Sequence, residues 1–71
     1  MNLKKVDSSM VHAIGYDPKS KTLEVVFTSG KIWVYEGVSK KVYQELLKSG
    51  SIGSYMRDNI IDCHPSYPIR R

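Results

Sequence analysis

A tryptophan, a tyrosine and a nearby lysine are the residues of this sequence best suited to bind nucleic acid. Trp33 and Tyr35 stand two residues apart, so they share one face if their segment is a strand, and Lys31 precedes them. Aromatic rings on a strand can stack on unpaired bases, each contributing about 1–3 kcal/mol, while nearby cations hold phosphates. The alternative is that both rings belong to the hydrophobic core, with only the hydroxyl of Tyr35 reaching its rim.

Further cations extend this hypothesis. Lys40 and Lys41 fall in the first turn of a predicted helix, where free backbone N–H groups and the helix dipole favour an anion. The alternative is a solvated helix end, which two lysines destabilise by about a few tenths of a kcal/mol. Arg57, Arg70 and Arg71 are additional candidates. The predicted nucleic-acid-binding residues are Lys31, Trp33, Tyr35, Lys40, Lys41 and Arg57.

Metal and catalytic chemistry are not indicated. His12, Asp62, Cys63 and His64 lack the patterned spacing of three or four ligands that a zinc site needs. Adjacent Cys63 and His64 rarely point at one another as nucleophile and base. The sequence has no glycine-rich phosphate loop and no suggestive pair of carboxylates. We therefore expect a domain that is not an enzyme and that uses no metal and no cofactor.

The totals predict one small domain over residues 1–71. Its single cysteine excludes an intrachain disulfide, and its apolar runs are too short for a transmembrane helix or a signal peptide. We therefore expect a cytoplasmic protein. The net charge of +4 suits a polyanionic partner, although many small domains with other partners carry as much.

The pattern of apolar residues predicts an α+β fold, a three-stranded antiparallel β-meander packed against one main helix plus a short C-terminal helix. The predicted core covers about residues 6–62, after a frayed or edge segment at residues 1–7. Ser39 is expected to cap the main helix and Gly50 to close it. The expected strands are Ser9–Tyr16, Leu23–Phe27 and Ile32–Tyr35, and the expected helices are Lys40–Ser49 and Ser54–Ile61.

The hairpin turn near Gly30 decides which face carries the aromatic pair. A two-residue turn places Trp33 and Tyr35 on the face away from Leu23, Val25 and Phe27. A three-residue turn with a bulge at Gly30 places them beside these residues, with Val26, Ile32 and Val34 on the other face. We favour the three-residue turn, because Thr-Ser-Gly suits a type I turn closed by a left-handed glycine.

Residues 63–71 are predicted to form a polar tail. Pro65, Pro68 and Arg70 make a PxxPxR string, which in polyproline II form can dock on an aromatic groove. Such strings arise easily by chance, so we expect a disordered tail.

An ordered set of short elements resembles the KTSC domain family, which occurs at the C-terminus of some lysyl-tRNA synthetases and as small stand-alone bacterial or phage proteins. The family's central Tyr-x-Tyr falls on Trp33-Val34-Tyr35, and its Phe-Asn falls on Met56-Arg57, two departures that keep apolar bulk. The resemblance covers about residues 6–62. It rests on Ser8-Ser9, Ile14-Gly15-Tyr16-Asp17, Leu23-x-Val25-x-Phe27-x-x-Gly30, Trp33-x-Tyr35, Val42-Tyr43 with Leu46-Leu47, and Ser51-x-Gly53-x-Tyr55 with Ile60.

The resemblance implies an association with RNA, because of the synthetase fusions. Together with the cations and the aromatic pair, it favours a small binding module for RNA or a tRNA-related partner. The alternative is a protein-interaction or self-association module that uses an exposed apolar sheet face or an edge strand.

Overall fold

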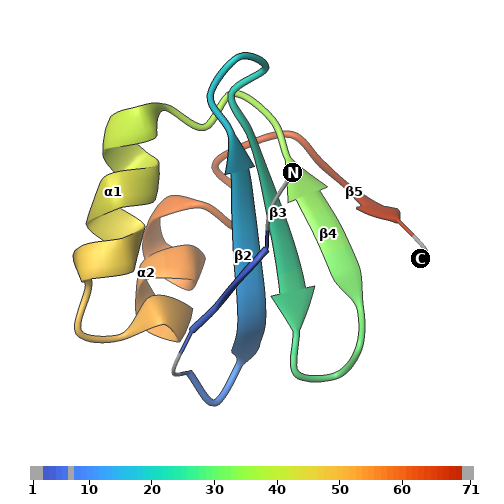
Figure 1. The fold of residues 1–71 in the computed structure, drawn as a ribbon, viewed down its shortest axis with the longest axis vertical. Helices are drawn as coiled ribbons and strands as arrows, with labels where there is room; N and C mark the ends of the chain where they lie inside the picture. Colours follow the sequence, from blue (N-terminus) through green and yellow to red (C-terminus); the bar gives the residue numbers. More distant parts are fainter. Residues whose placement is uncertain (1–2, 7, 70–71) are drawn as a thin grey trace.

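The computed structural model describes residues 3–6 and 8–69, which form a five-stranded antiparallel sheet with two helices packed on one face (Figure 1). The strands lie side by side in their order along the chain. The elements are β1 (Lys4–Lys5), β2 (Val11–Asp17), β3 (Thr22–Phe27), β4 (Ile32–Tyr35), α1 (Lys40–Lys48), α2 (Ile52–Asn59) and β5 (Ser66–Ile69). The predicted α+β class is confirmed, whereas three strands were too few.

The two additional strands form the edges of the sheet. β1 pairs Lys4 with Ile14 of β2, within the segment expected to be frayed or an edge. β5 pairs with β4, so the prediction of a disordered tail is wrong for residues 66–69. Pro68 lies opposite Trp33 in this outer strand, a position that tolerates a residue without an N–H donor. Arg70 of the PxxPxR string and Arg71 lie outside the described residues.

The turn between β3 and β4 has the favoured three-residue form. Gly30 donates its N–H to the Phe27 oxygen at 2.9 Å and has a φ of 91°, the left-handed conformation expected of a glycine there. The register then pairs Val25 with Trp33 and Leu23 with Tyr35. Both aromatic residues therefore lie on the same face as these two apolar side chains, as predicted.

The helix caps explain where the helices begin and end. Ser39 caps α1 by accepting the Val42 N–H at 3.2 Å, as predicted. The other end of α1 is closed by Ser49, whose hydroxyl donates to the Leu46 oxygen at 2.8 Å, whereas Gly50 lacks the expected positive φ. α2 begins at Ile52, two residues before the predicted start, because Ser51 is its N-cap.

The core lies between the helices and one face of the sheet. Ile14, Leu23 and Val25 of the sheet pack with Leu46 of α1 and Met56 of α2, all fully buried. Burying side chains of this size stabilises a fold by about 1.5–3 kcal/mol each. Neither helix in residues 3–6 and 8–69 has the length and apolar character needed to cross a bilayer.

The far face of the sheet carries no helix. Ala13, Val34 and the carboxylate residue Glu24 are nonetheless buried there, and Glu24 lies between Gly15 of β2 and Val34 of β4. Tyr67 of β5, which pairs with Val34, is 45% exposed and is the most exposed large apolar side chain of this face.

Candidate functional site

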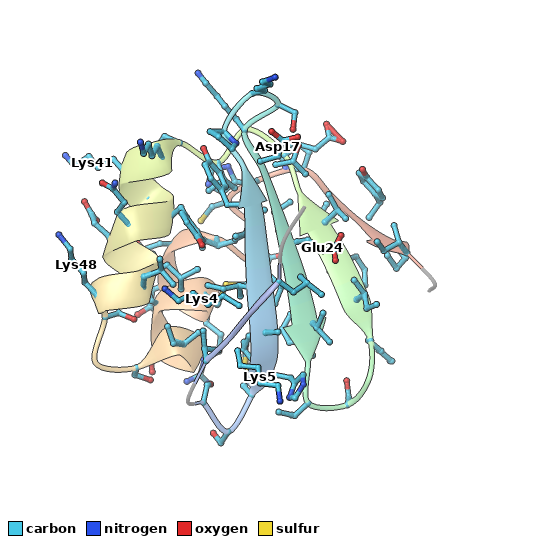
Figure 2. All side chains as sticks on the ribbon, viewed as in Figure 1. Lys4, Lys5, Asp17, Glu24, Lys41 and Lys48 are labelled. Carbon is cyan, nitrogen blue, oxygen red and sulfur yellow. The ribbon has the colours of Figure 1, made fainter. Side chains whose placement is uncertain are left out.

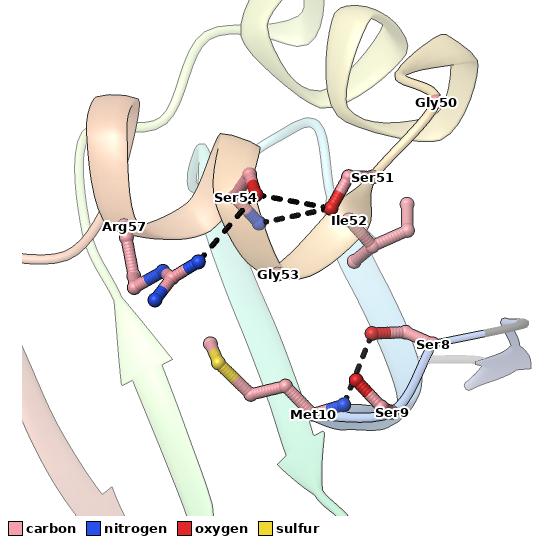
Figure 3. A pocket seen from close by; sticks show the side chains of 9 residues that line it. All are labelled: Ser8, Ser9, Met10, Gly50, Ser51, Ile52, Gly53, Ser54 and Arg57. Carbon is pink, nitrogen blue, oxygen red and sulfur yellow. Dashed lines mark hydrogen bonds between the residues drawn. The ribbon is translucent and has the colours of Figure 1, made fainter.

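A polar hollow opens between the segment that leads into β2 and the N-terminal half of α2 (Figure 3). We call it the serine groove. Its volume of about 340 Å³ lies within the range of small-ligand sites. It is lined by Ser8, Ser9, Met10, Gly50, Ser51, Ile52, Gly53, Ser54 and Arg57.

Hydrogen bonds within a short turn shape one wall of the groove. The hydroxyl of Ser8 accepts the backbone N–H groups of Met10 at 3.2 Å and of Val11 at 3.3 Å. Thr28 of the β3–β4 turn fixes the same segment from the other side, because its N–H donates to the Met10 oxygen at 3.0 Å. Hydrogen bonds to Ser8 and to Thr28 therefore fix the backbone of this short wall.

The opposite wall is the first turn and a half of α2. The hydroxyl of Ser51 accepts the Ser54 N–H at 3.4 Å and donates to the Ser54 hydroxyl at 3.1 Å. Arg57 donates from Nη2 to the same Ser54 hydroxyl at 3.5 Å, which holds the guanidinium at the rim (Figure 3). No acidic residue lies in the first turn of α2, so no carboxylate there offsets the positive end of the helix dipole.

A glycine lets the two walls approach. A Cβ on Gly53 would lie 3.4 Å from the Met10 Cβ and 3.9 Å from the Ser8 hydroxyl oxygen. A larger side chain at this position would fill the groove floor. Gly53, which lies in the first turn of α2, therefore sets the width of the groove.

A second groove adjoins the first, because Ile52 lines both. Its volume is about 320 Å³, and its lining adds the cations Lys4 and Lys5 of β1. No acidic residue described in the structure lines either groove. The pair of grooves thus offers hydroxyl and N–H donors between Arg57 on one side and two lysines on the other, an arrangement suited to a phosphate-bearing chain.

The predicted aromatic pair belongs to the core side of the sheet. Tyr35 is 4% exposed and part of the core cluster, so its ring face is not available to a base. Burial raises the pKa of Tyr35, and the charge of Asp62 adds to this shift. Trp33 is partly buried against the core. The structure thus agrees with the core alternative for Tyr35, and stacking on the pair as a platform is not supported.

The predicted cations do not form one surface. Lys31 is exposed in the β3–β4 turn, next to Thr28 and the wall of the serine groove. Lys40 and Lys41 are exposed at the start of α1, at the opposite end of the sheet, where Lys41 is labelled in Figure 2. Of the six predicted residues, only Arg57 lines either of these two grooves.

The residues considered for metal binding stay dispersed. The described part of the chain has no group of three or more His, Cys, Asp or Glu residues that could hold an ion. Cys63 is exposed, with its sulfur 3.9 Å from the Asp58 oxygen. His12 lies in an irregularity of β2 and is exposed.

Sequence reasoning missed the serines and Gly53 as parts of a site. Ser8-Ser9 and Ser51-x-Gly53 entered the family resemblance, yet none of these polar positions has a role in a predicted core. These positions were the available signal in the sequence, because small polar residues with no role in packing often belong to a turn or a binding site.

Comparisons with known proteins agree with this architecture. The KTSC domain model matches residues 7–63. An uncharacterized protein of Stutzerimonas stutzeri is 37% identical over 62 residues, covering 87% of each chain. A Tsukamurella paurometabola protein is 35% identical over 54 residues, covering 76% of this chain and 81% of its own. The crystal structure of a KTSC domain protein from Yersinia pestis superposes with a TM-score of 0.95 and 28% identity, covering 97% of each chain. This chain therefore belongs to the KTSC domain family.

Proposed function

We propose that this domain is a non-catalytic module that binds RNA through its phosphate backbone. The serine groove carries the proposal, because hydroxyl groups, the N–H groups at the start of α2 and Arg57 converge there without an acidic neighbour in the described lining. Donors of this kind position a nucleic-acid backbone. The adjoining groove continues the same chemistry with Lys4 and Lys5.

Each group has a defined role in this proposal. Arg57 supplies a forked, permanently charged donor to phosphate oxygens, and its bond to Ser54 limits the freedom it loses on binding. The serine hydroxyls can rotate to donate to the same anion. Lys31 follows the β3–β4 turn, which is hydrogen-bonded to Met10, and adds long-range electrostatic attraction for phosphates. Base stacking has no part, so we propose that binding depends little on RNA sequence.

The salt dependence of binding tests this function. A labelled single-stranded RNA should bind the protein at about 50 mM salt and lose most of its affinity by about 200 mM, since phosphate contacts release counterions. Arg57→Gln should lower the affinity and reduce the salt slope by about 0.7 for one lost phosphate contact on a single strand.

Lys48→Gln provides the matched control. Lys48 is exposed, lies in the last turn of α1 and lines neither groove, so its replacement removes one positive charge without removing a lining side chain. If the two variants bind RNA equally, the groove is not the site. If the wild-type protein binds no RNA at low salt, the function is wrong.

A protein-interaction module is the second candidate, and Tyr67 is the observation that favours it. Tyr67 is 45% exposed on the far face, where Val26, Ile32 and Ile69 are only partly buried. An exposed apolar group of this kind often marks a contact with protein. Sedimentation of a strict monomer across the accessible concentration range would exclude self-association through this face.

A further inference from the structure

Four lysines lie at the end of the sheet opposite the serine groove. Lys19 and Lys21 belong to the β2–β3 turn, and Lys40 and Lys41 begin α1; all four are exposed. Figure 1 shows this turn and the start of α1 at the same end of the molecule. We call this surface the lysine end.

Specific contacts hold the two segments that carry the lysines in place. The Val38 N–H, just before α1, donates to the Lys21 oxygen at 2.9 Å. The Tyr16 hydroxyl at the end of β2 donates to the Val38 oxygen at 2.6 Å, and the Tyr16 ring stacks on Tyr43 of α1 at 4.7 Å. The turn and the helix start are therefore fixed to each other from both sides of Val38.

The nearby acids leave this end positive. Asp17 and Glu36 are the carboxylates of the same segments, and the charge of Asp62 acts on the adjacent Tyr35, against four lysines. The Asp17 carboxylate accepts the Lys19 N–H at 3.0 Å, and this bond lowers the pKa of Asp17. No ion pair joins any of the four lysines to another described residue.

Lys21 occupies a backbone conformation that lysine disfavours. Its φ is 56°, in the left-handed region where glycine and asparagine are preferred. Either residue would present the same backbone oxygen to Val38. The hydrogen bond therefore explains the conformation, but it does not explain a lysine side chain. Strained positions of this kind are often functional.

We propose that Lys19, Lys21, Lys40 and Lys41 form a second phosphate-binding surface for the RNA held in the serine groove. This inference rests on the proposed function. The protein extends 28 Å along its longest axis, so a strand stacked at the duplex rise of about 3.4 Å per nucleotide reaches both ends with roughly eight nucleotides, and a more extended strand reaches them with fewer. The partner is then an extended RNA segment that passes along the domain and contacts it at two ends.

Lys21→Asn tests the inference because stability and binding should move in opposite directions. Asparagine accommodates the positive φ, so the melting temperature should rise. The loss of one ammonium should lower the affinity for a twelve-nucleotide RNA (about one and a half times the estimated span) and reduce the salt slope by about 0.7. The double change Lys40→Gln with Lys41→Gln should reduce the slope by about 1.4.

Arg57→Gln and Lys48→Gln, measured on the same RNA, separate the possible outcomes. If Arg57→Gln weakens binding but the lysine-end variants match Lys48→Gln, the inference is overturned and the groove function stands. If the lysine-end variants weaken binding and Arg57→Gln does not, the lysine end binds RNA and the groove proposal fails. If the wild-type protein binds no RNA, both are wrong.

Discussion

The two ends of the sheet present positive charge in different ways. At the groove end, Arg57 stands beside serine hydroxyls and backbone N–H groups in a hollow whose walls are hydrogen-bonded turns. At the lysine end, exposed ammonium groups extend from a turn and a helix start that an aromatic stack holds together. Directional donors fix where a phosphate sits, whereas exposed lysines act over a longer range and are screened by salt. One small domain can therefore separate positioning from attraction.

The largest expected effect is a loss of stability that is greater at the lysine end than at the groove end. Tyr43→Ala removes the ring stacked on Tyr16 and should destabilise the protein by about 2 kcal/mol, less than a fully buried aromatic because Tyr43 is partly buried. Hydrogen exchange of the Val38 amide should accelerate more than that of Ser54. Tyr43→Phe keeps the ring, so a loss as large as that of Tyr43→Ala would contradict the role of the stack.

The two N-caps provide a matched pair. Ser51→Ala and Ser39→Ala each remove a cap that accepts one backbone N–H, and each should destabilise the protein by about 1 kcal/mol in thermal unfolding. Only Ser51 lines the groove, so only Ser51→Ala should also weaken RNA binding by a protein that is still folded. Equal effects of the two variants on affinity would remove the distinction between the ends.

The free energy of unfolding should decrease as the pH rises in alkaline solution. Burial raises the pKa of Tyr16 and of Tyr35 above the ordinary value of 10.0. The folded state therefore keeps these protons when the unfolded state loses them. Their contribution is fully present below pH 10 and is lost as the pH rises through the folded-state values. Denaturant unfolding at several pH values, with phenolate absorbance, measures this. A Tyr35→Phe protein with an unchanged alkaline slope would argue against a role for Tyr35.

The smallest expected effect concerns the groove floor. Gly53→Ala gains helix propensity but brings a methyl group within 3.4 Å of Met10, so stability should change by less than about 0.5 kcal/mol. The added methyl narrows the groove and should weaken RNA binding. Gly50→Ala adds a methyl group to the same lining without narrowing it, because a Cβ there meets no atom within 4 Å. Titrations in which both variants bind like the wild type would show that the floor does not contact RNA.

Local patterns predicted the parts of the fold that depend on local physics. The Thr28-Ser29-Gly30 turn set the register of β3 and β4, and Ser39 marked the start of α1. β5 was missed because Pro65 and Pro68 favour a tail in isolation, while pairing with β4 overrides that preference. α2 was placed two residues late because Gly53 weakens helix propensity, whereas the Ser51 cap and the packing of Ile52 offset this.

The candidate site could be predicted only in part for a different reason. Ser8 and Gly53 are far apart in the sequence, and only the packing of α2 against the segment before β2 brings them together. The aromatic pair was the stronger signal in the sequence, yet strand residues such as Tyr35 serve the core as readily as a ligand. Charge counting found Arg57 but could not place it beside the serines.

Chemical-shift mapping of the labelled protein with a twelve-nucleotide single-stranded RNA at low salt tests the central claim most directly. The account predicts that the amides of Met10, Gly53, Ser54 and Arg57 shift as RNA is added, and that added salt reverses the shifts. Shifts confined to the far face around Tyr67, or no shifts at all at low salt, would contradict it.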